Sequence, residues 1–157
     1  MSATRTSPAA GAIAPDLMVR LRRRLAASPA LSAAAPVLES LELDSAVIRL
    51  PYREEITNGY GVIHGGWLAI LADTAVAFAL ATNFDGKMGF ATSDLTIHFL
   101  RRARTDVRAH ARIVKKGKRV NVGDVEIVDA AGEPVARALT SFLLTTSSFD
   151  YAPEGKP

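Results

Sequence analysis

The chain has 157 residues, no cysteine and a formal net charge of +3. This length supports one domain with a full-sized hydrophobic core, and a hydrophobic content of 48% fits a globular protein. The lack of cysteine excludes disulfides, thiol catalysis and zinc sites built on cysteine. The histidines at positions 64, 98 and 110 are too far apart in sequence to suggest a metal cluster, so we expect neither a metal nor a resident cofactor.

Residues 1–35 are rich in Ala, Ser, Pro and Arg and poor in acidic residues. Within them, residues 17–25 predict a short basic helix that Asp16 caps behind Pro15. The composition is similar to that of a transit peptide, but we favour a loosely held N-terminal arm. We therefore expect a cytoplasmic protein whose functional domain spans residues 36–147, followed by a flexible tail at 148–157.

Apolar residues between positions 36 and 51 predict one strand or a pair of strands. An irregular connection follows around Asn58 and Gly61. Residues 67–81 are nearly all apolar or small, so a helix there would be hydrophobic on every side and would belong in the protein interior. Asp73 and Thr74 interrupt this run, and it is shorter than the ~20 residues of a membrane-spanning helix. We therefore do not expect membrane insertion.

Four further strands are predicted, at residues 89–99, 107–115, 119–128 and 134–144, with turns between them. In the second of these, alternate residues are apolar, which is typical of a sheet with one buried face. A register that places Arg108 opposite Glu126 also places His110 opposite Asp124, and the two opposite-charge pairs favour it. One apolar helix and a one-sided antiparallel sheet predict an α+β fold in which the sheet curls around the helix.

Basic residues are concentrated between positions 101 and 119, a segment with nine Lys or Arg and a single acidic residue, Asp106. Such a segment could attract a phosphate-bearing ligand or nucleic acid, or it could be the solvated face of a sheet. No aromatic residue lies among the basic ones, which disfavours binding of nucleic acid.

The predicted helix carries two features that suggest chemistry. Asp73 is a lone carboxylate in apolar surroundings, where its pKa should be raised toward the range of a general base. Gly65 and Gly66 stand at the helix start, where backbone N–H groups lack partners and could stabilise an oxyanion. On the residues alone, a structural, hydrogen-bonded aspartate is the commoner explanation for Asp73. Close backbone packing would explain the glycines equally well.

The order of elements and several short motifs resemble the hotdog-fold thioesterases, in particular the PaaI-like acyl-CoA thioesterases (4HBT superfamily). The matching residues are Asn58, Gly61, the His-Gly-Gly of residues 64–66 and the Leu-Ala-Asp-Thr-Ala of residues 71–75. The likeness continues at residues 95–101 and 116–119 and covers roughly residues 36–146. One departure is Arg102, at a position where the family has a proline.

The resemblance implies a curved antiparallel sheet around one long central helix, a dimer or a dimer of dimers (a homotetramer), and an acyl-CoA substrate. It implies that Asp73 is the general base or nucleophile and that Gly65 and Gly66 form the oxyanion site. Asn58 would hold the water or the carbonyl, and His64 would orient the loop or the thioester.

The resemblance also places a hydroxyl near the site, from either Thr92 or Ser93. Coenzyme A carries a diphosphate and a 3′-phosphate, which basic residues at the surface would bind. The residues expected in this role, together with the glycine of their turn, are Arg101, Arg102, Arg104, Lys115, Lys116, Gly117, Lys118 and Arg119.

Gly65 and Asp73 are eight residues apart, which is ~12 Å along one helix. One thioester carbon cannot contact both, so we expect a two-fold dimer in which Asp73 of one chain faces Gly65 of the other. Two alternatives remain: a non-catalytic acyl-CoA-binding or sensing protein with the same fold, and an enoyl-thioester hydratase. The lack of an Asp-x-x-x-x-His pair disfavours the hydratase, and the presence of Asp73 disfavours the sensor.

Overall fold

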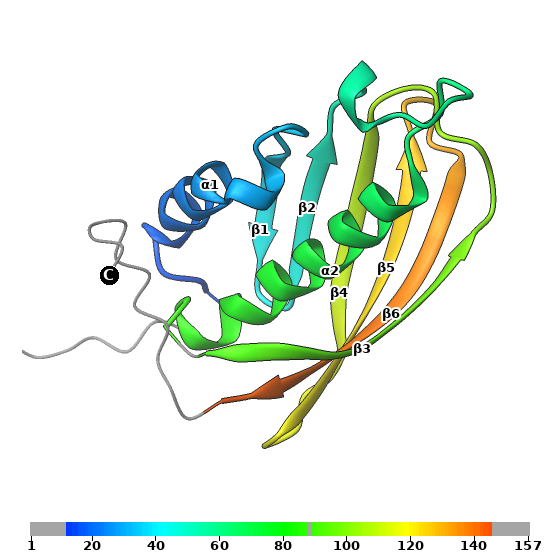
Figure 1. Cartoon of the computed structure of the whole chain (residues 1–157). Helices are drawn as coiled ribbons and strands as arrows, with labels where there is room; N and C mark the ends of the chain where they lie inside the picture. The colour runs from blue at the N-terminus through cyan, green and yellow to red at the C-terminus, as the bar shows by residue number, and fades with distance from the viewer. Residues whose placement is uncertain (1–11, 88, 146–157) are drawn as a thin grey trace, which may run out of the picture.

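The computed structural model describes residues 12–87 and 89–145. It contains one antiparallel sheet of six strands in the spatial order β1-β2-β4-β5-β6-β3, which curves around the long helix α2 (Gly65–Ala81) (Figure 1). The predicted α+β architecture, with the sheet wrapped around one apolar helix, is therefore confirmed. The strands are β1 (Val37–Glu42), β2 (Ser45–Leu50), β3 (Phe90–Phe99), β4 (Val107–Lys115), β5 (Val120–Asp129) and β6 (Pro134–Leu144).

Helix α2 is buried where it faces the sheet and open along the opposite side. Leu68, Ala72 and Val76 are at most 3% exposed, whereas Ile70 is 39% exposed. Helix α2 packs tightly against β5, where a Cβ on Gly123 would overlap the side chain of Val76. The stretch Gly65–Phe84 is long and apolar enough to cross a membrane by length and composition alone. Here more than half of it is buried inside the protein, against the curved sheet.

The pairing of β4 with β5 differs from the predicted register. His110 lies opposite Glu126 and Arg112 opposite Asp124, so both pairings are displaced by two residues. The prediction centred the hairpin on Gly117, but the connection is longer. A β-bulge interrupts β4 near its end, and the Gly117 N–H donates to the side chain of Asn121 at 3.2 Å. A displacement of two residues keeps every side chain on its face, so the predicted alternation of β4 is still correct.

Helix α1 (Leu17–Ala27) is the predicted basic helix, but it is not part of a loosely held arm. Its apolar side chains Leu17, Leu21 and Leu25 are at most 3% exposed and belong to the same core as α2. The guanidinium of Arg22 donates a 3.0 Å hydrogen bond to the carbonyl of Leu38, on the outer strand β1. The expectation of a loose arm is therefore wrong for residues 17–27, because this helix covers one edge of the sheet.

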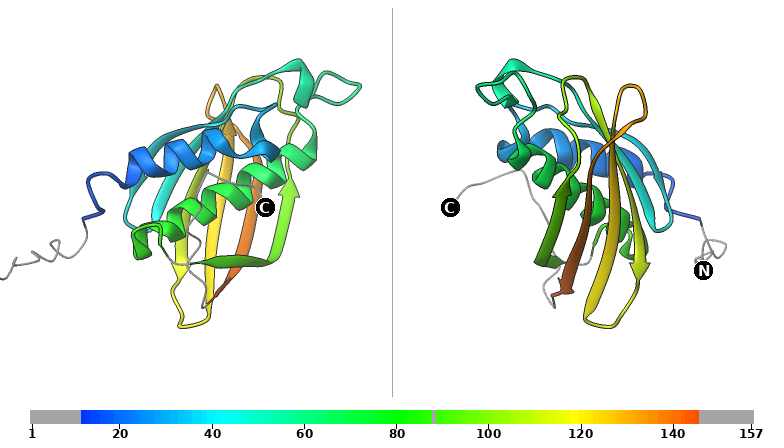
Figure 2. Two further views of the ribbon diagram at one scale, coloured as in Figure 1. Left: turned by 60° about the vertical axis from the view of Figure 1, so that its left-hand side comes forward. Right: turned by 90° about the vertical axis from the view of Figure 1, so that its right-hand side faces the viewer.

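The two edges and two faces of the sheet differ in what covers them. Figure 2 shows α1 and α2 on the concave side, while the convex side carries no helix from the described residues. At the edge opposite β1, most residues of β3 are exposed. The predicted flexible tail at 148–157 and the first eleven residues lie outside the described part of the chain.

Candidate active site

The start of α2 leaves one of its two glycine amides open. His64 is the N-cap residue, and its Nδ1 accepts a 2.9 Å hydrogen bond from the Gly66 N–H. The Trp67 N–H bonds the carbonyl of His64 at 2.9 Å. The N–H of Gly65 donates to no acceptor among the described residues, and it lies at the positive end of the helix dipole. Of the two predicted oxyanion donors, only Gly65 is therefore available, and His64 acts as a cap.

A pocket of about 350 Å³ lies in front of Gly65. The ring of Phe99 closes one side of it, and a Cβ on Gly65 would lie only 3.2 Å from that ring. Phe99 is not among the residues predicted for the site, because an aromatic residue at the end of a strand carries no distinguishing pattern. The pocket is lined by Asn58, Val62, Ile63, Gly65, Leu68, Phe99, Leu100, Arg101, Arg102 and Ala103.

Asn58 holds the loop that leads into α2. Its Oδ1 accepts hydrogen bonds from the backbone N–H groups of Tyr60 at 3.0 Å and Val62 at 3.4 Å. Its backbone N–H bonds the Val62 carbonyl at 2.8 Å. The Nδ2 group of Asn58 donates to no other described residue, and Asn58 lines the pocket with Gly65. The side chain thus orders the loop through its oxygen, while its NH₂ group has no acceptor among the described residues.

Asp73 is a half-buried carboxylate on α2 without an ion pair in the described part of the chain. Burial raises its pKa above the ordinary aspartate value, although a hydrogen bond from Thr92 opposes this shift. The Thr92 hydroxyl donates to Oδ1 of Asp73 at 2.9 Å. Ser93 instead donates its hydroxyl to the carbonyl of Ser141 at 3.1 Å. Of the two predicted hydroxyls, Thr92 is the one that contacts the carboxylate.

Asp73 and Gly65 do not meet within one chain. Both lie on α2, a regular helix, and their separation of eight residues corresponds to ~12 Å. Asp73 contacts β3 at Thr92, whereas Gly65 faces the pocket beside Phe99 at the far end of the same strand. A single chain therefore holds the carboxylate of Asp73 and the free N–H of Gly65 in two separate places.

The predicted cluster of basic residues is divided between two places. Arg101, Arg102 and Arg104 follow β3, and the first two line the Gly65 pocket. Residues 115–119 form the β4–β5 hairpin, at the other end of β4 (Figure 1). The length of β4 separates them by about 26 Å. Two members are also engaged: Arg101 pairs with Glu133 and Lys116 with Asp44, each at 2.7 Å. One chain therefore does not assemble the single phosphate site that the sequence predicts.

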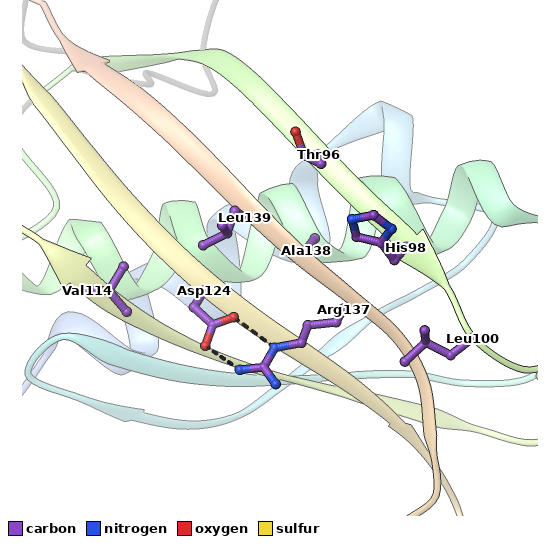
Figure 3. A pocket seen from close by; sticks show the side chains of 8 residues that line it. All are labelled: Thr96, His98, Leu100, Val114, Asp124, Arg137, Ala138 and Leu139. Atoms are coloured by element: carbon purple, nitrogen blue, oxygen red, sulfur yellow. Dashed lines mark hydrogen bonds and ion pairs between the residues drawn. The ribbon is translucent and has the colours of Figure 1, made fainter.

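A larger hollow, of about 510 Å³, lies on the convex face, and none of Asn58, Gly65, Asp73 and Thr92 lines it (Figure 3). Its carboxylate, Asp124, is bound by Arg137 at 3.2 Å and Arg112 at 2.9 Å. Burial alone would raise the pKa of Asp124, but these hydrogen bonds outweigh it and hold the pKa below the usual range. Asp124 is thus an ion-paired group and unsuited to act as a base. The hollow is lined by Thr96, His98, Leu100, Val114, Asp124, Arg137, Ala138 and Leu139.

No group of three or more His, Asp or Glu side chains in residues 12–87 and 89–145 is arranged to hold a metal ion. The groups available for chemistry near α2 are therefore a carboxylate, a hydroxyl, an amide side chain and a backbone N–H.

Both the sequence and the fold of this chain are similar to those of known proteins. The family model of the thioesterase superfamily matches residues 60–136. Acyl-coenzyme A thioesterase PaaI of Escherichia coli is 37% identical over 99 residues, which cover 62% of this chain and 69% of that protein. A protein of Halobacterium salinarum is 38% identical over 89 residues, which span 54% of this chain and only 59% of the relative. The Escherichia coli PaaI structure superposes with a TM-score of 0.77 and 24% identity, covering 87% of this chain and 99% of that one.

Proposed function

Because the chain belongs to the thioesterase superfamily, we propose that it hydrolyses acyl-CoA thioesters to a free acid and CoA. The observation that carries this proposal is the half-buried Asp73, whose pKa is raised by burial and whose hydrogen-bonding partner is the Thr92 hydroxyl. A carboxylate with a raised pKa is a stronger base than an ordinary aspartate, and hydrolysis of a thioester requires a base that accepts a proton from water.

The chemistry needs a base or nucleophile and a donor for the oxyanion. With Asp73 as the base, the carboxylate takes a proton from water while the water oxygen adds to the thioester carbon. The N–H of Gly65 stabilises the negative charge that forms on the carbonyl oxygen. The C–S bond then breaks, and the thiolate of CoA leaves and takes up the proton.

A nucleophilic role for Asp73 uses the same groups in another order. Its carboxylate would attack the thioester carbon, release the thiolate and form a mixed anhydride that water then hydrolyses. A single turnover in ¹⁸O-labelled water tests the nucleophilic route. Label enters the carboxylate of Asp73 only if this carboxylate has been the nucleophile and water then attacks the aspartyl carbon of the anhydride. Label found solely in the released acid is expected from the general-base route and also from attack of water on the acyl carbon of the anhydride, so label in Asp73 is the decisive result.

We further propose that the site forms between two chains of a homodimer. The outer strand β3 is exposed along most of its length, while the opposite edge of the sheet is covered by α1. A second chain that adds its own β3 in antiparallel orientation would continue the sheet and cover the open side of α2, where Ile70 is exposed. This pairing supplies Asp73 from one chain and Gly65 from the other.

The same arrangement would explain the divided basic residues. In an antiparallel pair of β3 strands, the end of one strand lies beside the start of the other. The residues after β3, Arg102 and Arg104, would then approach the hairpin at 115–119 of the second chain. Both groups could contact the phosphates of one CoA molecule, although they are far apart in a single chain.

The proposal is tested by the variant Asp73→Asn in a thiol-release assay with a panel of acyl-CoAs. We expect kcat to fall about 100- to 10,000-fold, the range that a general base contributes, without loss of the fold. Glu126→Gln is a matched control, because Glu126 is an exposed carboxylate on the convex face. Wild-type protein that binds acyl-CoA but releases no thiol from any member of the panel would indicate a binding or sensing protein instead. The same panel identifies the preferred acyl group.

A further inference from the structure

Tyr60 is an aromatic residue whose side chain does not pack in the protein core. It is 80% exposed, more than any other large hydrophobic residue in the described part of the chain. It stands at the tip of the loop between η2 (Glu54–Ile56) and α2, two residues after Asn58. A single exposed aromatic on a mobile segment would need no explanation.

The loop that carries Tyr60 is, however, held in one shape. Asn58 bonds the backbone at both Tyr60 and Val62, and Thr57 forms a β-bridge with Ile63. Gly61 has a φ of 64°, a conformation that favours glycine, and its carbonyl accepts a 3.0 Å hydrogen bond from the Tyr52 hydroxyl. The ring is therefore displayed from a rigid support, which is what a contact surface for a ligand requires.

Two arginines without partners lie beside this loop. The Nη1 of Arg104 is 3.9 Å from the position that a Cβ on Gly61 would occupy. Arg102 lines the pocket that contains the free N–H of Gly65. Within residues 12–87 and 89–145 neither side chain forms a hydrogen bond or an ion pair, in contrast to Arg101, which is bound to Glu133. Among the described residues, two guanidinium groups are therefore without a partner, one beside the loop of Tyr60 and one in the pocket of the free amide.

We propose that Tyr60, Arg102 and Arg104 bind the nucleotide end of the CoA thioester, with the adenine stacked on the Tyr60 ring and phosphate oxygens on the two arginines. This inference rests on the proposed function, because the thioester must reach Gly65. Aromatic rings stack on a nucleobase through their faces, and the planar guanidinium group matches phosphate geometry. Arg102 and Gly65 line one pocket, so the pantetheine arm would run through it from the nucleotide to the reacting carbon.

Kinetics with two substrates that share an acyl group test the role of Tyr60. One substrate is the acyl-CoA, and the other is the corresponding acyl-pantetheine, which lacks the nucleotide. We expect Tyr60→Ala to raise KM for acyl-CoA about tenfold, with kcat and both constants for acyl-pantetheine unchanged. Tyr60→Phe keeps the ring and should behave as wild type. Equal effects of Tyr60→Ala on both substrates, or no effect on either, would overturn the proposal.

A charge-matched pair tests the arginines. Arg104→Ala should raise KM for acyl-CoA and leave that for acyl-pantetheine unchanged, and added salt should reduce the difference from wild type. Arg23→Ala removes the same charge from the exposed face of α1 and should change neither constant. An increase of KM in both variants would mean that the overall charge of the protein, and not Arg104, attracts the substrate.

A binding experiment without hydrolysis separates this inference from the proposed function. Adenosine 3′,5′-bisphosphate, titrated calorimetrically, should bind wild type and Tyr60→Phe alike and bind Tyr60→Ala about tenfold more weakly. If the nucleotide binds in this way but no thioester is hydrolysed, the site stands and the proposed function fails. If acyl-CoA is hydrolysed but the Tyr60→Ala variant binds the nucleotide as tightly as wild type does, the proposed function stands and the proposed nucleotide site is wrong. The same conclusion follows if the substitution changes only the oligomeric state of the protein.

Discussion

The hydroxyl of Thr92, on the edge strand β3, donates a 2.9 Å hydrogen bond to Oδ1 of Asp73, on the central helix. A β-bulge at Ser93 makes this contact possible. Thr92 lies opposite Phe142, and Leu95 lies opposite Thr140; Phe142 and Thr140 are buried residues of β6. Thr92 and Leu95 therefore both face the helix, although residues three positions apart in a regular strand would point to opposite faces. The bulge thus directs a hydroxyl at the one carboxylate of α2 and joins the open edge of the sheet to the proposed catalytic group.

Removal of the Thr92 hydroxyl should shift the pH dependence of catalysis. The hydrogen bond favours the ionised form of Asp73, so its loss in Thr92→Val should raise the pKa of Asp73 further above the ordinary value. Asp73 must be ionised to act, so the acidic limb of kcat/KM against pH should move to higher pH. Thr92→Ser retains a hydroxyl and should retain the wild-type limb. An unmoved limb in the valine variant would exclude Asp73 as the group that titrates.

The role of the Gly65 amide can be tested by removing its hydrogen. Gly65→Pro deletes this N–H at the first helical position, where proline is favoured, and the ψ of 134° at His64 suits a residue before proline. Gly65→Ala keeps the N–H but adds a comparable Cβ beside Phe99. We expect the proline variant to lose about 100- to 1,000-fold in kcat and the alanine variant to lose much less. Similar losses in both would point to packing as the role of this glycine.

A heterodimer of two inactive variants tests whether the site is shared. One chain would carry Asp73→Asn and the other Gly65→Pro, with different tags so that the mixed dimer can be purified. A shared site predicts about half of the wild-type activity, because one of the two sites then has an intact Asp73 and an intact Gly65. A site contained within one chain predicts no activity, since every chain carries one lesion.

The contribution of α1 to the core can be measured by denaturant unfolding. Leu21→Ala removes a side chain that is 1% exposed and should lower the free energy of unfolding by about 2–5 kcal/mol. Val19→Ala, on the same helix at 54% exposure, should change it by less than about 0.5 kcal/mol. Equal, small effects would mean that α1 is docked too weakly to belong to the cooperative unit.

The sequence by itself determined the elements and their faces. Residues 107–115 and 134–144 are strands with the predicted bounds, and the apolar run that contains Asp73 forms the central helix. These features are local, because the spacing of apolar residues matches the period of one element whatever lies opposite. The half-buried position and raised pKa of Asp73 follow from the same pattern, since its neighbours along the helix are apolar.

Only the tertiary structure decided which groups meet. The length of the β4–β5 connection set the pairing of Arg112 with Asp124. The extended conformation of β4 separated the basic residues at 101–104 from those at 115–119, which belong to one basic stretch of the sequence. The His64 side chain accepts a hydrogen bond from the N–H of Gly66 and not from that of Gly65. The sequence cannot show which of two neighbouring glycines has the free N–H. These outcomes depend on distances between residues that periodicity does not encode, because packing and turn geometry set them once the elements come together.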